Sequence, residues 1–346
     1  MNSLERFYAT IERKPVDRPA AWLGMPDRHA LPALLREYGV DSLHTLKLAI
    51  GDDFYAVEIP YDAPDAKAIY SAFNWYGENA PDDEHRTLTA DGCFKDAGEL
   101  KDLEFFNWPD PALYIDRKEC LRRVKRAPRV KAVLGVIWSA HFQDTCAAFG
   151  MGTAMMNMLA EPEIYQAVDD KIVAFYLKAN GIFYEATRGR LHAVLIGNDV
   201  GSQRALMVSP DLVRRYVIPG CRKLTEQAHS YGLKVIYHSC GAIADIIPDL
   251  IAAGVDAIHP IQARAEGMSA AALKTKFGGQ VSFCGGVDVQ DLMVNGTAED
   301  VAGEVNRLRA LFPTGLILSP SHEAILPDVP PKNIRALFET ATKASV

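Results

Sequence analysis

The chain of 346 residues lacks several features that would place it outside the class of cytoplasmic globular proteins. It has no uninterrupted apolar run of the ~18 residues that a membrane-spanning helix needs. Its start, MNSLERFYATIERKP, mixes acidic and basic residues and has no apolar signal core. Its six cysteines stand far apart without a CxxC pair, which argues against a disulfide framework. We therefore expect a cytoplasmic protein with no membrane partner.

The chain also lacks a strong excess of either charge. It has 37 Lys and Arg against 44 Asp and Glu, a formal net charge of −7, and its bases are spread along the chain rather than striped. This pattern does not favour binding to nucleic acid or to an anionic membrane, so small molecules or proteins are the expected partners. What the chain does have is apolar content, 49% of its residues, which is ample for a large buried core.

Short apolar runs rich in Val and Ile alternate with segments of helical period, most regularly in the second half of the sequence. Runs that are apolar on both faces are typical of a parallel sheet covered by helices. Eight such units in a chain of this size predict a single (β/α)8, or TIM, barrel domain over residues 1–346. The predicted strands are 18–24, 53–61, 130–138, 193–200, 234–241, 256–262, 281–288 and 315–322.

The surplus length lies mainly between residues 62 and 128, in the N-terminal half. This segment is polar, rich in turn residues and aromatic, and we interpret it as a capping insertion with a small hairpin rather than a separate domain. Its aromatic residues are expected to form a small satellite core, part of which could line a pocket lid. They are Trp75, Tyr76, Phe105, Phe106 and Trp108.

Polar and metal-binding residue types follow the later predicted strands at the point where each strand ends. In a (β/α)8 barrel the active site lies at this end of the strands, so these side chains are the candidates for chemistry. They are Asn198 and Asp199 after the fourth strand, His238 and Cys240 in the fifth, His259 and Gln262 in the sixth, Cys284 and Asp288 around the seventh, and Ser321, His322 and Glu323 after the eighth.

His238 and Cys240 stand two residues apart, so on a strand their side chains point to the same side. Zinc takes Cys sulfur and His nitrogen ligands, and catalytic zinc sites commonly have three protein ligands and one open position. His322 could supply the third ligand, and His259 or water the fourth. Such a pair is more often a buried histidine beside an inert cysteine than part of a metal site. Its position at a strand end favours the metal site.

The remaining candidates each have a structural and a functional interpretation. Asp199 either caps the next helix or holds a neighbouring loop, or else it acts in acid–base chemistry or beside a metal. Cys284 precedes Gly285 and is more typical of the core than of a ligand set. Asp288 either binds a ligand or pairs with a barrel residue. We expect Gln262 and Asp288 to contact a cofactor.

The motifs at these positions resemble the uroporphyrinogen decarboxylase superfamily, and within it the branch of corrinoid-linked methyltransferases. The resemblance covers nearly the whole chain and implies the (β/α)8 barrel. It rests on ERKPVDRPAAW, HSCGAIADIIPDLIAAGVDAIHPIQ, FCGGVDVQDLMVNGTAEDV and LSPSHEAILPDVPPKNIRALFETA. True decarboxylases carry an Arg-Gln-Ala-Gly-Arg motif for a tetrapyrrole with many carboxylates, whereas the matching region here has Arg28 alone. They also lack the HxCG pair.

In the methyltransferase branch, the positions of His238 and Cys240 match a zinc-binding His-x-Cys. Thiol-methylating members carry a second cysteine after the eighth strand, where this chain has His322. Replacing a thiolate with a neutral imidazole raises the formal charge of the zinc centre from zero to plus one, which makes it a harder Lewis acid. The resemblance therefore implies a zinc site that polarises an oxygen, as in a methyl ether, rather than a second thiol.

These observations together predict a zinc-dependent methyltransferase that moves a methyl group from a small donor, such as a methoxylated aromatic compound, to corrinoid cobalt. Asp199 or Glu323 would handle the proton of the leaving group. The chain lacks the Asp-x-His-x-x-Gly pattern of corrinoid-carrying domains, so the corrinoid is expected on a partner protein. The resemblance also implies a possible homodimer.

Three alternatives stay open at this point. The first is transfer in the opposite direction, from methylcorrinoid to a thiol or folate. The second is a cofactor-free decarboxylase with His322 as proton donor. The third is a carrier of metal or corrinoid without catalytic activity.

Overall fold

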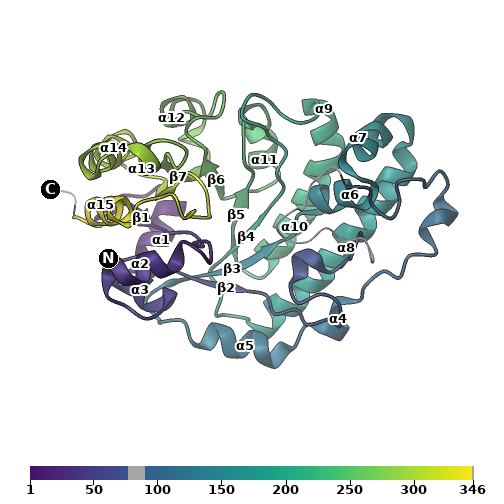
Figure 1. The fold of residues 1–346 in the computed structure, drawn as a ribbon, viewed down its shortest axis with the longest axis horizontal. Coiled ribbons are helices and arrows are strands. Elements are labelled where there is room, and N and C mark those ends of the chain that lie inside the picture. The colour runs from purple at the N-terminus through teal and green to yellow at the C-terminus, as the bar shows by residue number, and fades with distance from the viewer. Residues whose placement is uncertain (77–89, 345–346) are drawn as a thin grey trace.

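Eight parallel strands form one sheet, with helices around it (Figure 1). The computed structural model describes residues 1–76 and 90–344. Neighbouring strands pair in the order β1-β8-β7-β6-β5-β4-β3-β2, so the predicted (β/α)8 barrel is confirmed. The strands are β1 (Ala20–Ala21), β2 (Phe54–Glu58), β3 (Ala132–Trp138), β4 (Ala193–Gly197), β5 (Lys234–His238), β6 (Ala257–Ile261), β7 (Ser282–Val287) and β8 (Leu316–Pro320).

Helices connect the strands and cover the outside of the barrel (Figure 1). The helices before β4 are α1 (Ser3–Ile11), α2 (Leu31–Tyr38), α3 (Leu43–Ala49), η1 (Ile69–Ser71), η3 (Leu100–Leu103), α4 (Pro111–Tyr114), α5 (Arg117–Lys125), α6 (His141–Phe149), α7 (Met151–Ala160) and α8 (Pro162–Ala186). Those after β4 are α9 (Pro210–Leu212), η4 (Val213–Val217), α10 (Ile218–Ser230), η5 (Ala244–Ile246), α11 (Ile247–Ala252), α12 (Ala270–Phe277), α13 (Leu292–Asn295), α14 (Ala298–Leu311) and α15 (Pro331–Ala341). No helix of the described residues is long and apolar enough to cross a membrane.

The first strand is much shorter than predicted, and side chains replace ladder bonds at the seam between β1 and β2. The Asp53 N–H donates to the Ala21 carbonyl at 2.9 Å, and the Asp53 carboxylate accepts from the Ala21 N–H at 2.9 Å. The Asp52 carboxylate accepts from the Leu23 N–H at 3.0 Å. Because these carboxylates bind the backbone groups that a longer strand would pair, the barrel is held closed without a β1–β2 ladder.

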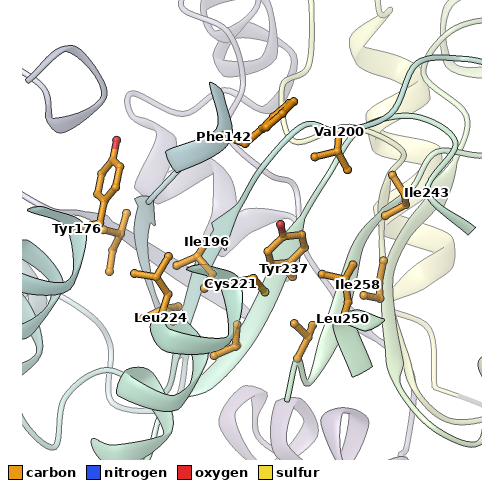
Figure 2. Close-up of a cluster of buried hydrophobic side chains, with 14 of the residues drawn as sticks. Phe142, Tyr176, Ile196, Val200, Cys221, Leu224, Tyr237, Ile243, Leu250 and Ile258 are labelled. Carbon is orange, nitrogen blue, oxygen red and sulfur yellow. The ribbon is translucent and has the colours of Figure 1, made fainter. Parts of the chain in front are cut away.

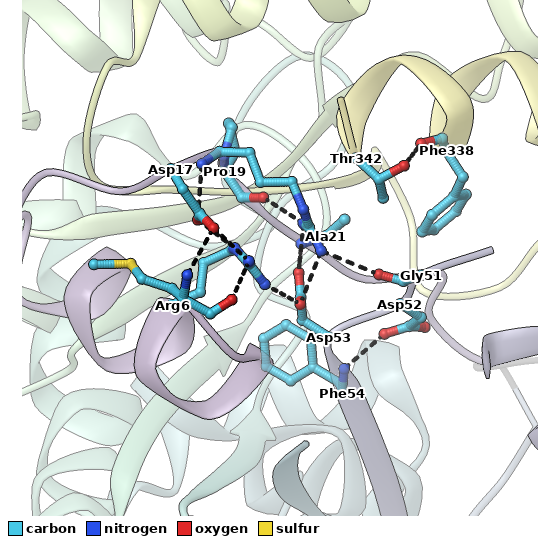
Figure 3. Close-up of polar contacts among 12 residues, drawn as sticks. Arg6, Asp17, Pro19, Ala21, Gly51, Asp52, Asp53, Phe54, Phe338 and Thr342 are labelled. Carbon is cyan, nitrogen blue, oxygen red and sulfur yellow. Dashed lines mark hydrogen bonds and ion pairs between the residues drawn. The ribbon is translucent and has the colours of Figure 1, made fainter. Parts of the chain in front are cut away.

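Two arginines neutralise the buried carboxylate at this seam (Figure 3). Arg6 Nη1 lies 2.7 Å and Arg18 Nη1 2.8 Å from the Asp53 carboxylate, which is fully buried. Arg6 also binds Asp17, with Nε 2.8 Å from Oδ1. A buried charge is tolerated when it is paired and hydrogen-bonded, as it is here. This network lies at the start of the strands and stabilises the barrel away from its mouth.

The hydrophobic core has one layer inside the barrel and one between the sheet and the helices. Leu195 and Ile236 belong to the cluster inside the barrel. The next residues along their strands, Ile196 and Tyr237, pack outside against helical residues such as Leu224 of α10 (Figure 2). This alternation follows from the two-residue period of a strand. Cys284 lies in the inner cluster and is fully buried, in agreement with its prediction as a core residue.

The described parts of the 62–128 insertion contain short helices and no strand. The small hairpin is therefore not found in residues 62–76 or 90–128, and residues 77–89 lie outside the description. The aromatic core exists: the Trp75 ring stacks on Phe73 at 4.6 Å and on Phe106 at 5.2 Å between centroids. Phe73 contacts Phe175 of α8, so this core is attached to the helical shell. Phe105 is 89% exposed and does not belong to it.

The basic residues are less evenly spread than predicted. Within residues 117–129 of α5 and the turn after it, seven bases stand beside a single acid, Glu119. Most of these bases are exposed, and Glu119 binds two of them, Arg122 and Arg123. This helix therefore carries a local concentration of bases within a chain whose other bases are scattered.

Candidate metal centre

His238 and Cys240 meet at the mouth of the barrel, where β5 ends. His238 is 4% exposed, and its Nε2 lies 3.5 Å from the Cys240 sulfur. At ordinary zinc bond lengths, a sulfur and a nitrogen ligand on a tetrahedral ion stand about 3.5 Å apart. The two atoms therefore already have the separation that a shared zinc ion requires.

Asp199 reaches the same point from the loop after β4. Its Oδ1 accepts from the Cys240 N–H at 2.8 Å and lies 3.2 Å from His238 Nε2. Burial opposes the charge on this carboxyl group, but the hydrogen bond and charge of His238 and the Cys240 N–H outweigh it, and the pKa of Asp199 is lowered to about 2. Asp199 is thus a carboxylate at neutral pH, able to act as an oxygen ligand or to orient its neighbours.

His259 of β6 contacts the other nitrogen of His238. The two Nδ1 atoms are 2.9 Å apart, so one must donate and the other accept. Burial disfavours a charge on both rings, but Glu323 and Asp199 raise the pKa of His238 well above its usual value. Burial and the charges of His238 and His322 lower that of His259. These opposite shifts favour His238 Nδ1 as the donor, and Nε2 is the nitrogen of His238 that faces Cys240.

His322 and Glu323 follow β8 and approach from the other side of the mouth. Glu323 Oε2 lies 3.7 Å from His238 Nδ1 and 3.4 Å from His322 Nδ1. The Ala324 N–H donates to His322 Nδ1 at 3.0 Å, so Nε2 is the nitrogen of His322 that remains for Cys240. A hydrogen bond to Cys240 is the main reason that the pKa of His322 is raised.

The loop that carries Glu323 is fastened to the first strand. The Met25 N–H donates to the Glu323 carbonyl at 2.7 Å. Gly24 precedes it with a φ of 82°, and a Cβ at Gly24 would collide with the same carbonyl. The β1 loop therefore sets the position of Glu323.

The side chains at the mouth form three overlapping groups, each with its metal-binding atoms within 4.8 Å of one another. They are Asp199, His238 and Cys240; His238, His259 and Glu323; and Cys240, His322 and Glu323. All the candidates for the metal centre thus lie together at the mouth, and Cys240 belongs to two of the groups.

The chemistry of these side chains fits zinc. A thiol, imidazole nitrogens and carboxylates are the ligand types that zinc takes. Two further atoms, Glu323 Oε2 and His259 Nε2, are buried without a hydrogen-bond partner among the described residues. Buried polar atoms without partners are rare in native proteins and are expected where an ion or small molecule completes a site.

Gln262 and Asp288, the two residues predicted to contact a cofactor, both accept hydrogen bonds from backbone N–H groups of nearby turns. Gln262 accepts from the Gly241 N–H at 2.6 Å and so holds the turn after Cys240. Asp288 accepts from the Gln290 and Leu292 N–H groups at 3.0 and 3.2 Å, which are the contacts of a turn cap. Contact of either residue with a cofactor remains a prediction.

A cavity of about 250 Å³ adjoins the metal centre on the β7–β8 side of the mouth. Its walls combine apolar side chains with a few polar groups, the usual composition of a small-molecule site. The lining residues are Gln262, Val289, Gln290, Ser321, His322, Ala324, Leu326, Asp328 and Val329.

Two tryptophans beside the centre are absent from the sequence prediction. The Trp138 ring lies 5.4 Å from that of His238 at 87°, and the Trp22 ring lies 5.2 Å from that of His259. Trp138 is the last residue of the predicted strand 130–138, so an inspection of strand ends that included the first three strands would have found it.

The comparison with protein families agrees with this architecture. The family model described as uroporphyrinogen decarboxylase (URO-D) matches residues 118–344, which include every residue of the candidate metal centre. The chain belongs to the uroporphyrinogen decarboxylase family. The predicted resemblance to this family is therefore confirmed.

Among solved structures, a methyltransferase from Methanosarcina mazei is similar to this chain, with a TM-score of 0.72. The similarity covers 99% of this chain and 98% of that protein at 17% sequence identity, so it shows a shared fold. No curated protein matches the chain.

Proposed function

We propose that this member of the family is a zinc-dependent methyltransferase that moves a methyl group from a small O-methyl donor to corrinoid cobalt on a partner protein. The observation that carries the proposal is the 3.5 Å separation of Cys240 Sγ and His238 Nε2 at the mouth of the barrel. The fold shared with a methyltransferase supports it.

His238 and Cys240 are two of the proposed zinc ligands, and two residues compete to be the third. Asp199 Oδ1 is 3.2 Å from His238 Nε2, close to the spacing of two ligands on one tetrahedral ion. His322, the ligand expected from sequence, shares a group with Cys240. For His322 Nε2 to bind a metal, its proton must move to Nδ1, and the hydrogen bond from Ala324 must break. Metal content of Asp199→Asn and His322→Ala decides between them.

Zinc, when bound, would polarise the oxygen of the donor and so make it a better leaving group. The chain's own residues supply the rest of the site. His259 Nδ1 accepts a hydrogen bond from the His238 Nδ1–H and fixes the ring that faces Cys240. Glu323 Oε2 has no hydrogen bond within the described residues and lies at the centre, so its carboxylate can accept a hydrogen bond from the group or water molecule that brings a proton to the departing oxygen. Gln262 holds the turn after Cys240.

The charges at the mouth argue against decarboxylation of a substrate with many carboxylates. Asp199 is a carboxylate at neutral pH, with Glu323 nearby, and these groups repel a highly anionic ligand. Arg28, the one arginine in the region that matches the decarboxylase motif, is exposed, and its Nε binds His29 at 3.0 Å. A small neutral donor fits this environment better than a substrate with many carboxylates does.

Methyl transfer to free cob(I)alamin tests the proposal. In the reaction, the methyl group of 2-methoxyphenol bonds to Co(I), which supplies the electron pair, and the phenol oxygen leaves with the electrons of the broken bond and takes up a proton. The product methylcobalamin is followed by its absorbance. We expect transfer that is lost after chelation and restored by zinc, absent in Cys240→Ser and retained in Cys284→Ala.

Transfer that is insensitive to chelation would contradict the role of zinc. Metal-independent release of CO2 from a carboxylic acid would favour the decarboxylase alternative. Demethylation of methylcobalamin by a thiol or folate, without reaction of any O-methyl donor, would reverse the proposed direction.

A further inference from the structure

We propose that Trp138 forms one wall of the donor site and selects methyl donors that carry an aromatic ring. This inference rests on the proposed function and deepens it, because it names a residue that distinguishes aromatic from aliphatic donors.

Trp138 and Ser139 both have a left-handed backbone, with φ of 60° and 55°. For a residue as bulky as tryptophan this conformation is an outlier, and glycine would adopt it at no steric cost. The β3–β4 pairing also shifts register between Val136 and Trp138. Strain of this kind persists where surrounding structure enforces it, and it concentrates at functional sites.

The surrounding structure does enforce it. The Ser139 N–H donates to the Ile137 carbonyl at 2.8 Å, and the His141 N–H donates to the Ser139 carbonyl at 2.9 Å, so two tight turns follow each other. The Ser139 side chain is fully buried and accepts from Asn180 Nδ2 of α8 at 3.1 Å. The position of Trp138 is thus fixed by the barrel and by the helix that covers it.

The fixed indole lies next to the proposed zinc ligand. Its ring is 5.4 Å from the His238 ring at 87°, and it packs on the residues inside the barrel while remaining partly exposed. In this proposal, a donor whose oxygen lies near His238 Nε2 and Cys240 Sγ directs its remaining atoms towards the indole of β3, and not into the cavity on the β7–β8 side. Aromatic rings attract one another at centroid separations of 4.5–7 Å.

An aromatic donor can pack against the Trp138 indole, whereas methanol is too small to do so. We compare 2-methoxyphenol with methanol as donors to cob(I)alamin, using zinc-loaded parent, Trp138→Gly and Trp138→Phe. Glycine removes the indole and relieves the left-handed backbone, and phenylalanine keeps a ring. The matched control is Trp108→Phe, in the aromatic core of the insertion.

We expect Trp138→Gly to raise the KM for 2-methoxyphenol roughly three- to tenfold, with a much smaller change in kcat. The KM for methanol should not change, and Trp138→Phe should restore most of the affinity for the aromatic donor. An equal rise in KM for both donors in Trp138→Gly would overturn the inference and leave Trp138 as a packing residue. A higher KM for a cationic donor, tetramethylammonium, with an unchanged KM for 2-methoxyphenol would also overturn it.

Calorimetric binding of phenol separates failure of this inference from failure of the proposed function. The inference can be tested even if no donor is turned over. Binding of phenol to the parent and to the Trp108→Phe control, but not to Trp138→Gly, would still support contact between Trp138 and an aromatic donor. Equal binding of phenol to parent and Trp138→Gly overturns it, whatever the enzyme does with methyl donors.

Discussion

His238 Nδ1 lies 2.9 Å from His259 Nδ1, and this contact determines which nitrogen of His238 faces Cys240. Histidines that bind metals usually give their second N–H to a hydrogen-bond acceptor, which fixes the ring and the tautomer. In this chain the acceptor is a second, fully buried histidine. With Nδ1 held by His259, Nε2 is the nitrogen through which His238 would bind a metal, once the Nε2 proton is released.

Replacement of His259 should weaken the metal centre without removing a proposed ligand. We expect His259→Ala to lower zinc affinity roughly 10- to 100-fold, because His238 loses the group that orients it. Competition with a chromophoric chelator measures this affinity. His44→Ala, on an exposed helix position, should leave it unchanged. Equal affinity of parent and His259→Ala would contradict the orienting role.

Gly24→Ala should displace Glu323 through its backbone. Both Gly24 and Gly39 have positive φ, so alanine at either position costs about 1–2 kcal/mol of stability. At Gly24 the new methyl group would also meet the Glu323 carbonyl, whereas at Gly39 it meets nothing within 4 Å. We expect both variants to be less stable in urea and Gly24→Ala alone to lose methyl transfer. Similar transfer rates in the two variants would count against positioning of Glu323 by this loop.

Asp17 should make stability depend on pH below about pH 4. Its hydrogen bond to Arg6 holds its pKa well below the usual value of 3.8, against the opposing effect of burial. Because the folded-state pKa is depressed, the contribution to stability is full above the unfolded-state pKa and is lost as the pH falls towards the folded-state value. Asp17→Asn should therefore lower the free energy of unfolding at pH 7, and the difference from the parent should shrink below pH 4.

Urea unfolding at pH 7, 4 and 3 measures this dependence. The matched control is Asp62→Asn, because Asp62 pairs with Lys67 at the surface, where screening leaves little net stabilisation. A difference between parent and Asp17→Asn that stays constant from pH 7 to pH 3 would show that the charge of Asp17 is not responsible.

The pattern of apolar runs was sufficient to predict the barrel. All eight predicted runs contain the observed strands, because buried parallel strands must be apolar on both faces. The first strand was predicted too long, since the sequence does not reveal that the Asp52 and Asp53 side chains bind the backbone groups of its neighbours. Local propensity cannot predict a contact between residues some thirty positions apart.

The sequence was sufficient to predict which residues lie together at the candidate site, but not which of their atoms contact one another. Strand ends meet at one face of a barrel, so Asp199, His238, Cys240 and His322 could be expected together. Which nitrogen of each ring faces its neighbour depends on hydrogen bonds from residues such as Ala324. The position of Trp138 depends on a left-handed backbone that a tryptophan in the sequence does not suggest.

Metal content is the most direct test of the zinc centre. We would purify the parent, Cys240→Ser and Cys284→Ala without chelators and measure bound metals by plasma mass spectrometry. We expect one zinc per chain in the parent and in Cys284→Ala, because Cys284 lies in the barrel core, and none in Cys240→Ser. A parent that contains no zinc and does not take it up on titration would contradict the proposed metal centre and the methyltransferase built on it.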